Sequence, residues 1–329
     1  MDEGDPAPGF DIDPRVDQVR LGITNRNSNP VADPRNALKL FALRKAIVGS
    51  RPDVVLPFMV HTAVPVILAL TGTGLKVAAC ERSHPVLYEI GAIWRSLRKF
   101  AYHRATAVVT QTAEAAQHFR EWKSLRERVH VIPNVVPQPE DNLRIPPCLE
   151  RSRTLLSVGR LSPEKRYDLL IRAFAQSELA ASGWTLEIAG DGPEETELRK
   201  LARSLGLKDA VELPGWTAEP ARRFIRAQLY VLTSKFEGFP NALCEAMVHG
   251  CAPVSFDCSC GPRDIIRQGV NGILVSNGDM KRLARELRDL AGNDKKRAQF
   301  AAKAPEILER FGEESVLRRW DKLFHELTD

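Results

Sequence analysis

Residues Thr154 to Gln176 read TLLSVGRLSPEKRYDLLIRAFAQ, an apolar run, a short polar turn and an amphipathic run. The first run predicts a strand, and the last has apolar residues at helical spacing. The same unit recurs through the second half of the chain. Further strands are predicted at 185–190, 211–215, 229–234 and 252–256, with helices at 194–206 and 241–250 and two more at the end. This alternation is typical of an α/β fold in which helices cover a parallel sheet.

The first half of the chain shows a similar alternation. We predict a helix near 36–48 and strands near 54–59, 76–80, 107–110 and 129–132. The stretch from Val135 to Ser152 interrupts this pattern with four prolines and mixed charges, which predicts an interdomain linker. The resulting division has an N-terminal domain at 1–140, a linker at 141–152, a C-terminal domain at 153–312 and a closing helix at 313–329.

The composition is that of a soluble globular protein. The chain has 329 residues, 43% of them hydrophobic and 27% charged, and this length favours two domains. The most membrane-like segment, Val54 to Gly72, contains Pro57, His61 and Pro65. A buried strand followed by a buried helix therefore fits this segment better than a spanning helix. We expect a cytoplasmic protein.

The net charge of +5 is modest and suits phosphate ligands or acidic lipid head groups better than dedicated nucleic-acid binding. Six cysteines in a chain of this length do not form a disulfide framework. Cys258 and Cys260 have poor spacing for zinc, so no metal site is expected.

Unusual residues follow the first strand of the second half. Ser162 is a candidate N-cap, and Pro163 suits the first helical position. Arg160 and Lys165 flank this turn, although cations near a helix N-terminus oppose the helix dipole. A diphosphate bound by these side chains and by backbone amides would reverse the sign of that interaction. The alternative is two solvated surface cations.

The ends of the next two strands carry weaker signals. Gly190 and Asp191 belong to AGDGPEE, and Trp216 closes LPGW. Glycine and proline at such places are what any tight strand-to-helix turn needs. A purely structural role explains them about as well as ligand binding does.

The stretch SKFEGFPNALCEAMVHG, Ser234 to Gly250, sets Glu237 and Glu245 on either side of a helix start. Pro240 suits the first helical position and Gly250 the C-terminal stop. Glu245 lies off the apolar stripe, and Glu237 lies in the loop, where Gly238 allows a close backbone approach. A ligand with hydroxyls at both ends and phosphates between them, a nucleotide sugar, fits this pattern. The alternative is that both acids merely complement a helix N-terminus.

These motifs resemble those of a known family. The segments VGRLSPEK, AGDGP, EGFPNALCEAMVHG and GPRDIIRQGVNGILV, in that order, are similar to the nucleotide-binding half of family 4 retaining glycosyltransferases. ACERSHP, IWRSLRKFAYHRATAVVTQTAEAAQHF and VIPNVV resemble members that build bacterial surface polysaccharides and lipid-linked oligosaccharides. The resemblance implies the GT-B architecture: two Rossmann-like domains face a cleft, and the C-terminal helix packs back toward the N-terminal domain.

The resemblance also implies roles for individual residues. Arg160 and Lys165 would bind the donor diphosphate, Glu245 the ribose hydroxyls, and Glu237 with the backbone after Gly238 the donor sugar. The remaining positions matched on the donor side are Gly190, Asp191, Trp216, Phe239, Pro240, Asn241, Ala242 and Leu243. The implied donor is a nucleoside diphosphate sugar, with UDP as the expected nucleotide, and no cofactor or metal is required.

The catalytic base is less well defined. Many relatives carry an acceptor-side histidine after the strand that here ends in ACERSHP, whereas this chain has Glu81 and Arg82 there and His84 just beyond. Glu81 and Arg82 are therefore matched to the acceptor side, and His84 with Glu237 are the catalytic candidates. The alternative for His84 is a structural loop residue whose hydrogen bonds are made within the protein. In a front-face retaining mechanism the departing phosphate oxygen can itself take the acceptor proton.

The opening segment, MDEGDPAPGFDIDPRVDQVRLG, resembles the part of the family that follows the second strand. The first strand, glycine-rich loop and first helix are thus expected to be missing, which leaves the N-terminal domain incomplete and a sheet edge unpaired. A misassigned start codon, an impaired protein or a partner that covers the gap would each account for this.

The function predicted is retaining transfer of a sugar from a nucleoside diphosphate sugar to a hydroxyl of a glycan or polyprenyl-linked glycan acceptor. Two alternatives remain: a nucleotide-sugar epimerase of the same architecture, and a non-catalytic nucleotide-sugar binding protein. An acceptor-independent change in the sugar would indicate the first, and binding without turnover the second.

The segment from Glu89 to Ala105 has the pattern of a basic amphipathic helix. Its apolar positions are Ile90, Ile93, Trp94, Leu97, Phe100 and Ala101, and its cations are Arg95, Arg98, Lys99 and Arg104. A core-facing helix with a solvated face is one interpretation. The other is peripheral contact with the inner face of the cell membrane through Arg95, Arg98 and Lys99.

Overall fold

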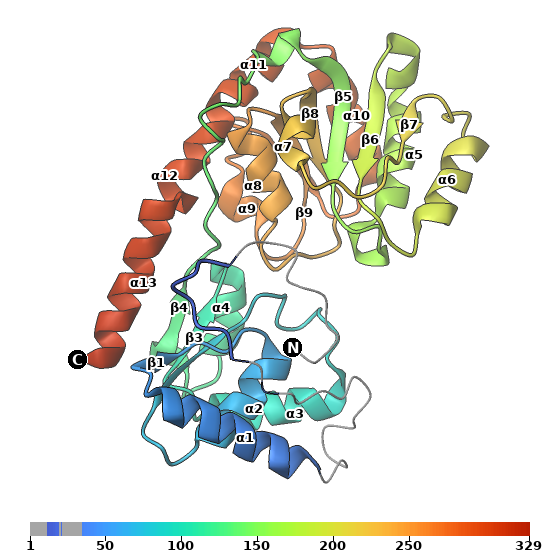
Figure 1. Ribbon diagram of the computed structural model, residues 1–329. Helices are drawn as coiled ribbons and strands as arrows, with labels where there is room; N and C mark the ends of the chain where they lie inside the picture. Colours follow the sequence, from blue (N-terminus) through green and yellow to red (C-terminus); the bar gives the residue numbers. More distant parts are fainter. Residues whose placement is uncertain (1–11, 20, 22–34) are drawn as a thin grey trace.

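The computed structural model describes residues 12–19, 21 and 35–329. Within these ranges two α/β domains lie one above the other, joined by an extended linker and by a long C-terminal helix (Figure 1). Most of the opening segment 1–22, on which the prediction of a missing strand rests, lies outside the described residues.

The N-terminal sheet has four described strands, all parallel, in the order β1-β2-β3-β4. They are β1 (Val54–Val55), β2 (Lys76–Cys80), β3 (Ala107–Thr110) and β4 (Val129–Val131). The predicted strands at 76–80 and 107–110 are confirmed. The first strand is shorter than predicted because Pro57 has no N–H to donate and Met59 adopts a φ of 68°.

Four helices pack on one face of this sheet: α1 (Arg35–Ser50), α2 (Val60–Leu70), α3 (Gly91–Tyr102) and α4 (Ala113–Arg120) (Figure 1). The apolar segment predicted as a buried strand and helix forms β1 and α2. None of the described helices combines the length and the apolar composition needed to cross a bilayer.

The C-terminal sheet is also parallel throughout, with the order β10-β9-β8-β5-β6-β7. Its strands are β5 (Ser152–Val158), β6 (Thr185–Ala189), β7 (Val211–Glu212), β8 (Ala227–Leu232), β9 (Ala252–Asp257) and β10 (Ile273–Ser276). Leu155 in β5 lies opposite both Leu186 and Leu229. The strand order reverses at β5, which creates the kind of crevice at which open α/β sheets bind ligands.

Helices cover both faces of this second sheet (Figure 1). One face packs against α5 (Tyr167–Ser177), α6 (Glu195–Ser204) and α10 (Met280–Ala291). The other packs against α7 (Pro220–Phe224), α8 (Asn241–Val248) and α9 (Pro262–Ile265). The fold is therefore two Rossmann-like domains, as the sequence predicted.

Two connections join the domains. Figure 1 shows the linker leaving β4 and running beside α12 (Leu308–Phe311) toward α11 (Asp294–Lys303) and β5. The backbone N–H of Val136 donates to the carbonyl of Phe311 at 2.8 Å, which ties this linker to the C-terminal helices. The last helix, α13 (Glu313–Thr328), returns to the N-terminal domain and ends near β1 (Figure 1).

Helix α13 completes the core of the N-terminal domain on the face opposite α2 and α3. Its residues Val316, Leu323 and Leu327 pack with Ala78 and Val109 of the sheet. Because these contacts come from opposite ends of the chain, the N-terminal domain depends on the C-terminal residues for part of its core.

The substitution Leu323→Ala tests this dependence. Leu323 is 1% exposed, so its truncation removes buried apolar surface and leaves a cavity, at an expected cost of about 2–5 kcal/mol in the free energy of unfolding. Leu317→Ala on the same helix is the matched control, because Leu317 is 46% exposed and its loss should change stability by less than about 0.5 kcal/mol. Urea unfolding measures both; equal shifts would show that α13 does not complete this core.

Candidate active site

The turn after β5 brings two cations to the carboxyl edge of the C-terminal sheet. Ser162 precedes a three-residue 3₁₀ turn, Pro163–Lys165, and Arg166 in the left-handed region separates that turn from α5. The Ser162 hydroxyl donates to Glu164 Oε1 at 2.7 Å and makes no capping bond to the backbone. Ser162 and Pro163 thus hold the predicted cap and first helical positions, but of this short 3₁₀ turn and without a capping hydrogen bond, and α5 starts only at Tyr167.

Lys165 and Glu237 form an ion pair at this edge. The Lys165 ammonium donates to Glu237 Oε1 at 2.6 Å, and the Ser234 hydroxyl donates to the same oxygen at 2.6 Å. Arg160 is exposed, and no acidic partner is found for it among the described residues. The structure thus brings the predicted diphosphate ligand Lys165 into contact with the predicted sugar ligand Glu237.

Neighbouring strand-end loops pack closely against this turn. A Cβ at Gly190 would collide with the carbonyl group of Gly159, and the N–H of Leu161 donates to the carbonyl of Asp191 at 2.7 Å. Gly190 in turn donates to the carbonyl of Gly215, which holds the loop of the highly exposed Trp216. Gly190 is therefore needed for the approach of two loops, while Asp191 and Trp216 present their side chains to solvent.

Helix α8 carries the second acid. It begins at Asn241, so Pro240 is its cap and does not occupy the first helical position as predicted. Gly250 follows the helix with a φ of 73°, as a C-terminal stop requires. Glu245 is half-buried, and burial raises the pKa of its carboxyl group. Its side chain makes no hydrogen bond to any described residue.

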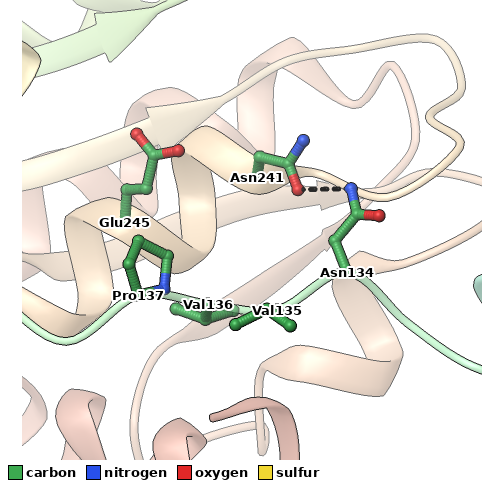
Figure 2. Close-up of a pocket in the computed structure, with 6 residues that line it drawn as sticks. All are labelled: Asn134, Val135, Val136, Pro137, Asn241 and Glu245. Carbon is green, nitrogen blue, oxygen red and sulfur yellow. Dashed lines mark hydrogen bonds between the residues drawn. The ribbon is translucent and has the colours of Figure 1, made fainter. Parts of the chain in front are cut away.

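Glu245 borders two cavities. One, of about 330 Å³, is also lined by Asn134, Asn241 and linker residues 135–137. The other, of about 660 Å³, adjoins His249 and residues 218–222. Figure 2 shows the linker passing α8 and the Asn134 amide meeting that of Asn241. An unpaired carboxylate beside such space can accept hydrogen bonds from ligand hydroxyls.

The loop before α8 is also where the two domains touch. A Cβ added at Gly238 would collide with the carbonyl oxygen of Arg82 and lie 3.0 Å from the Cα atom of Ser83. Asn134 Nδ2 donates to Asn241 Oδ1 at 2.9 Å, which bridges the linker and α8. The sequence predicted that Gly238 allows its loop backbone to approach a ligand. In the structure Gly238 instead allows its loop to approach the backbone of Arg82 and Ser83 in the other domain.

Three of the residues matched to the donor side belong to the domain core or border it. Phe239 is buried against Phe311, with ring centroids 5.6 Å apart, and Leu243 is fully buried. Ala242 is half-buried and packs beside the same cluster. The side chains of Phe239 and Leu243 cannot contact a donor directly, so only their backbone groups are candidates.

Glu81, matched to the acceptor side, is buried inside the N-terminal domain. It is 2% exposed, accepts a hydrogen bond from Tyr102 at 2.8 Å and lies 3.6 Å from Arg98. Burial raises the pKa of Glu81, and the charge of Arg98 partly offsets this. The expectation that Glu81 meets an acceptor is wrong, because the carboxylate is enclosed by its own domain.

Arg98 is correspondingly not a lipid-facing residue. It is 5% exposed, and besides facing Glu81 it donates to the carbonyl of Pro85 at 2.8 Å. The predicted membrane contact through Arg98 is therefore wrong. Arg95 and Lys99 on the same helix are exposed.

His84 is buried at the domain interface beside Phe236. Its Nδ1 accepts hydrogen bonds from the N–H groups of Val86 and Leu87 at 3.1 and 3.0 Å, which places the proton of the neutral ring on Nε2. Burial lowers the pKa of His84, partly offset by Glu114. A neutral His84 with this tautomer is a hydrogen-bond donor toward the interface and has no free lone pair with which to act as a base.

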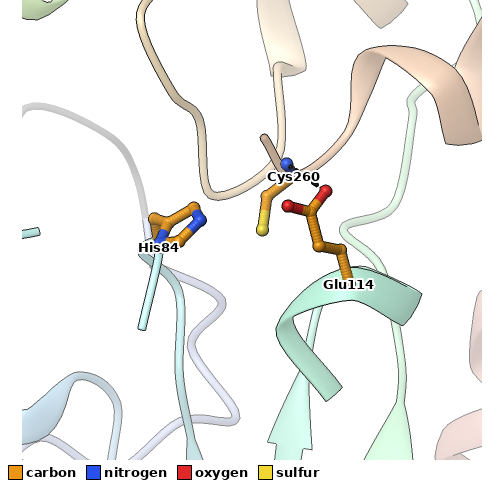
Figure 3. Close-up of side chains that lie close together, drawn as sticks. All are labelled: His84, Glu114 and Cys260. Carbon is orange, nitrogen blue, oxygen red and sulfur yellow. Dashed lines mark hydrogen bonds between the residues drawn. The ribbon is translucent and has the colours of Figure 1, made fainter. Parts of the chain in front are cut away.

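His84, Glu114 and Cys260 come close enough together to suggest a metal site (Figure 3). Glu114 Oε2, however, already accepts the N–H of Cys260 at 3.0 Å. Burial raises the pKa of the Cys260 thiol to about 11, whereas a metal requires the thiolate. His84 would also have to carry its proton on Nδ1, where two N–H groups point. These three residues are therefore an interdomain contact that does not fit a metal ion.

Sequence reasoning missed the residues that join the domains. Asn134 belongs to the quoted segment VIPNVV, yet no local pattern assigns it a partner 107 residues away. Glu114 looks like an ordinary acid in the first turn of α4. Only the closed arrangement of the two domains reveals either contact.

A family model described as glycosyl transferases group 1 matches residues 140–307, more than half of the chain. The chain belongs to the group 1 glycosyl transferases. A second family model, described as a glycosyl transferase 4-like domain, matches residues 2–135. The two matches cover the two domains of this glycosyl transferase in turn.

Named relatives share different parts of the chain. An exopolysaccharide phosphotransferase of Streptomyces coelicolor is 36% identical over 205 residues, 61% of this chain and 21% of its own length. The amylovoran biosynthesis glycosyltransferase AmsD of Erwinia amylovora is 26% identical over 91% of this chain and 86% of its own. A Campylobacter jejuni alpha-1,4-N-acetyl-D-galactosaminyltransferase, whose name specifies a PP-undecaprenol-linked glycan, is 26% identical over 88% of this chain and 79% of its own.

Solved structures share the fold. HepE of Anabaena, crystallised with UDP, has a TM-score of 0.75 at 20% identity, covering 87% of this chain and 82% of its own. TarM of Staphylococcus aureus, in a complex that also contains UDP, has a TM-score of 0.74 at 22% identity, covering 87% of this chain and 58% of its own. The architecture of this glycosyl transferase is therefore GT-B.

Gly238→Ala tests the interdomain contact. Because the added methyl group would collide with backbone of the opposite domain, the domains must separate, and we expect the rate of sugar transfer to fall at least about tenfold. Gly49→Ala is the control, since its added Cβ meets nothing within 4 Å. Activity and thermal midpoint should be measured together. An unchanged rate in Gly238→Ala, or an equal loss in Gly49→Ala, would contradict the role of this contact.

Proposed function

We propose that this chain transfers a sugar from a nucleoside diphosphate sugar, with UDP as the nucleotide, to a hydroxyl of a glycan or lipid-linked glycan, with retention at the anomeric carbon. The observation that carries the proposal is the Lys165–Glu237 ion pair, which joins the loops after β5 and β8; Arg160 lies on the first of these loops, and Glu245 lies on the helix that follows the second. Membership of the family and the UDP complexes of HepE and TarM support it.

The cations are suited to the diphosphate. Arg160 and Lys165 follow the carboxyl end of one strand, β5, on either side of the 3₁₀ turn. Charge-assisted hydrogen bonds from both side chains would neutralise the departing nucleotide without a divalent metal or another cofactor. Lys165 is already partnered by Glu237, so a phosphate oxygen would share the ammonium with that carboxylate.

The two acids have different tasks in this proposal. Glu245, half-buried beside open cavities, accepts hydrogen bonds from the ribose hydroxyls. Glu237, fixed by Lys165 and Ser234, accepts from hydroxyls of the donor sugar. Neither role requires either acid to form a covalent bond to the sugar.

The chemistry then needs little more than positioning. The acceptor oxygen attacks the anomeric carbon as the bond to the phosphate oxygen breaks, and the acceptor proton passes to that same departing oxygen. Attack and departure on one face retain the configuration. This route agrees with His84, whose Nδ1 lone pair is already used by two backbone N–H groups.

Incubation of the chain with UDP-sugars and a range of hydroxyl acceptors tests this function, with the product configuration assigned from anomeric proton couplings. Transfer with retention supports the proposal. A change in the donor sugar without an acceptor would identify an epimerase, and binding without turnover of any donor would identify a binding protein.

A cytoplasmic location at the inner face of the cell membrane is part of the same proposal. Helix α3 exposes Ile93 and Phe100 together with Arg95 and Lys99, and the guanidinium of Arg104 lies 3.9 Å from the centre of the Phe100 ring. Exposed apolar groups among cations suit a bilayer surface with anionic lipids. The undecaprenol-linked glycan named for the Campylobacter relative is an acceptor of the kind found there.

Arg160→Ala should weaken UDP binding at least about tenfold, because it removes a charge-assisted contact to a phosphate. Arg203→Ala is the control: Arg203 is an exposed arginine of α6 in the same domain, away from the strand-end turn. Titration calorimetry with UDP measures both. Wild-type affinity in the Arg160 variant would rule out its contact with the diphosphate.

The double substitution Arg95→Gln with Lys99→Gln should reduce binding to vesicles containing acidic lipid. Each cation near an anionic surface contributes about 1 kcal/mol, so loss of two should lower the partition coefficient roughly thirtyfold at low salt. Arg285→Gln with Lys295→Gln is the control, an equal change of charge on exposed residues of the other domain. If both variants lose the same affinity, net charge and not α3 determines binding.

A further inference from the structure

Arg82 occupies an unusual position at the carboxyl end of β2. Its guanidinium lies 4.9 Å from the ring centre of Phe58 and 5.9 Å from that of Trp320, which belongs to α13. Trp320 is itself stacked on Phe324, with ring centroids 5.7 Å apart. Aromatic faces on two sides restrict the orientation of the cation, so Arg82 is held in place before any ligand arrives.

The charge of Arg82 is not neutralised by the described part of the protein. Its one hydrogen bond there goes from Nη1 to Oδ1 of Asn134, a neutral amide, at 2.9 Å. Burial lowers the pKa of Arg82, and no carboxylate contributes to offset this. Arginine nevertheless stays charged in proteins, and a desolvated charge without a counter-ion is costly. An anion that completed its hydrogen bonds would recover that cost.

The surroundings are those of a ligand site. Phe58 lies three residues after the end of β1 and is 47% exposed although it is aromatic. Met59, the next residue, has a φ of 68°, which is rare for a side chain of this kind and concentrates at functional sites. The carbonyl of Arg82 lies against Gly238, next to Glu237. The guanidinium itself is hydrogen-bonded to Asn134, which lines a cavity together with Asn241 and Glu245 of the other domain.

We propose that Arg82, held by Phe58, Trp320 and Asn134, binds a carboxylate or phosphate group of the acceptor, so that the chain selects anionic glycans over neutral ones. This inference rests on the proposed function. The donor diphosphate has its own cations, Arg160 and Lys165, on the opposite domain. An exposed ring beside a fixed guanidinium offers stacking to a sugar and a paired hydrogen bond to its acidic group.

Calorimetric binding of methyl β-glucuronide and methyl β-glucoside to the full chain saturated with UDP tests the proposal. We expect the charged glycoside to bind wild type at least about tenfold more tightly than the neutral one, the effect of one charge-assisted pair. Arg82→Gln should abolish this difference and leave UDP affinity unchanged. Arg126→Gln, at an exposed arginine of the same domain, should behave as wild type.

Three results would overturn the inference. The first is equal binding, or no binding, of the two glycosides to wild type. The second is a preference for the glucuronide that survives in Arg82→Gln. The third is a preference for UDP-glucuronate over UDP-glucose that Arg82→Gln removes, because the anion recognised would then belong to the donor. UDP affinity is measured separately. If wild type does not bind UDP, the proposed function fails, and this outcome is distinct from failure of the inference about Arg82.

Discussion

The close approach of Gly238 to the carbonyl of Arg82 is the constraint on which the site depends. Only a residue without a side chain fits between these two backbones, and their contact sets the separation of the domains at the crevice. It places Glu237, one residue before Gly238, close to the loop that follows β2 in the N-terminal domain. The Asn134–Asn241 hydrogen bond and the contact between Glu114 and the N–H of Cys260 act at the same interface and fix the relative rotation.

Charge is distributed unequally across that interface. On the donor side Lys165 has a carboxylate at 2.6 Å, while the nearby Arg160 is exposed and can turn toward a phosphate at little desolvation cost. In the N-terminal domain Arg98 and Glu81 compensate each other in the core, whereas Arg82 contacts an amide and two aromatic rings and no carboxylate among the described residues. Removal of either partner would leave the other as an uncompensated buried charge. The uncompensated cation is the one for which binding an anion is favourable.

The fold could be predicted from the sequence because its strands and helices are locally encoded. Alternating apolar runs and turn residues indicated the strands of both domains except β10 (Ile273–Ser276), which was not predicted, and the motifs around Glu237 and Glu245 indicated the crevice. The roles of cations were harder to predict. Arg98 lies four residues after Trp94 and three before Ala101, a spacing that puts it on the buried side of α3. Helical periodicity does not show, however, that its partner on that side is Glu81.

The same limit applies to Phe239, Leu243 and Glu81, which motif matching assigned to ligands. A motif fixes which residues lie near a crevice, whereas packing decides which side chains point into it, and these three point into cores formed by distant segments. Local patterns also do not predict the contact of Trp320 with Arg82, because the two residues are separated by most of the chain.

That long-range contact has a mechanical consequence. Helix α13 follows α12 in the C-terminal half, and α12 receives the linker through the bond between Val136 and Phe311. The same helix carries Trp320 to Arg82 and packs Leu323 and Leu327 into the N-terminal core. Asn134 and Trp320 thus connect Arg82 to the two segments that cross between the domains. If Arg82 binds the acceptor as proposed, its guanidinium is therefore positioned by segments that continue into the C-terminal domain, and a change in the interdomain angle would couple acceptor binding to donor binding.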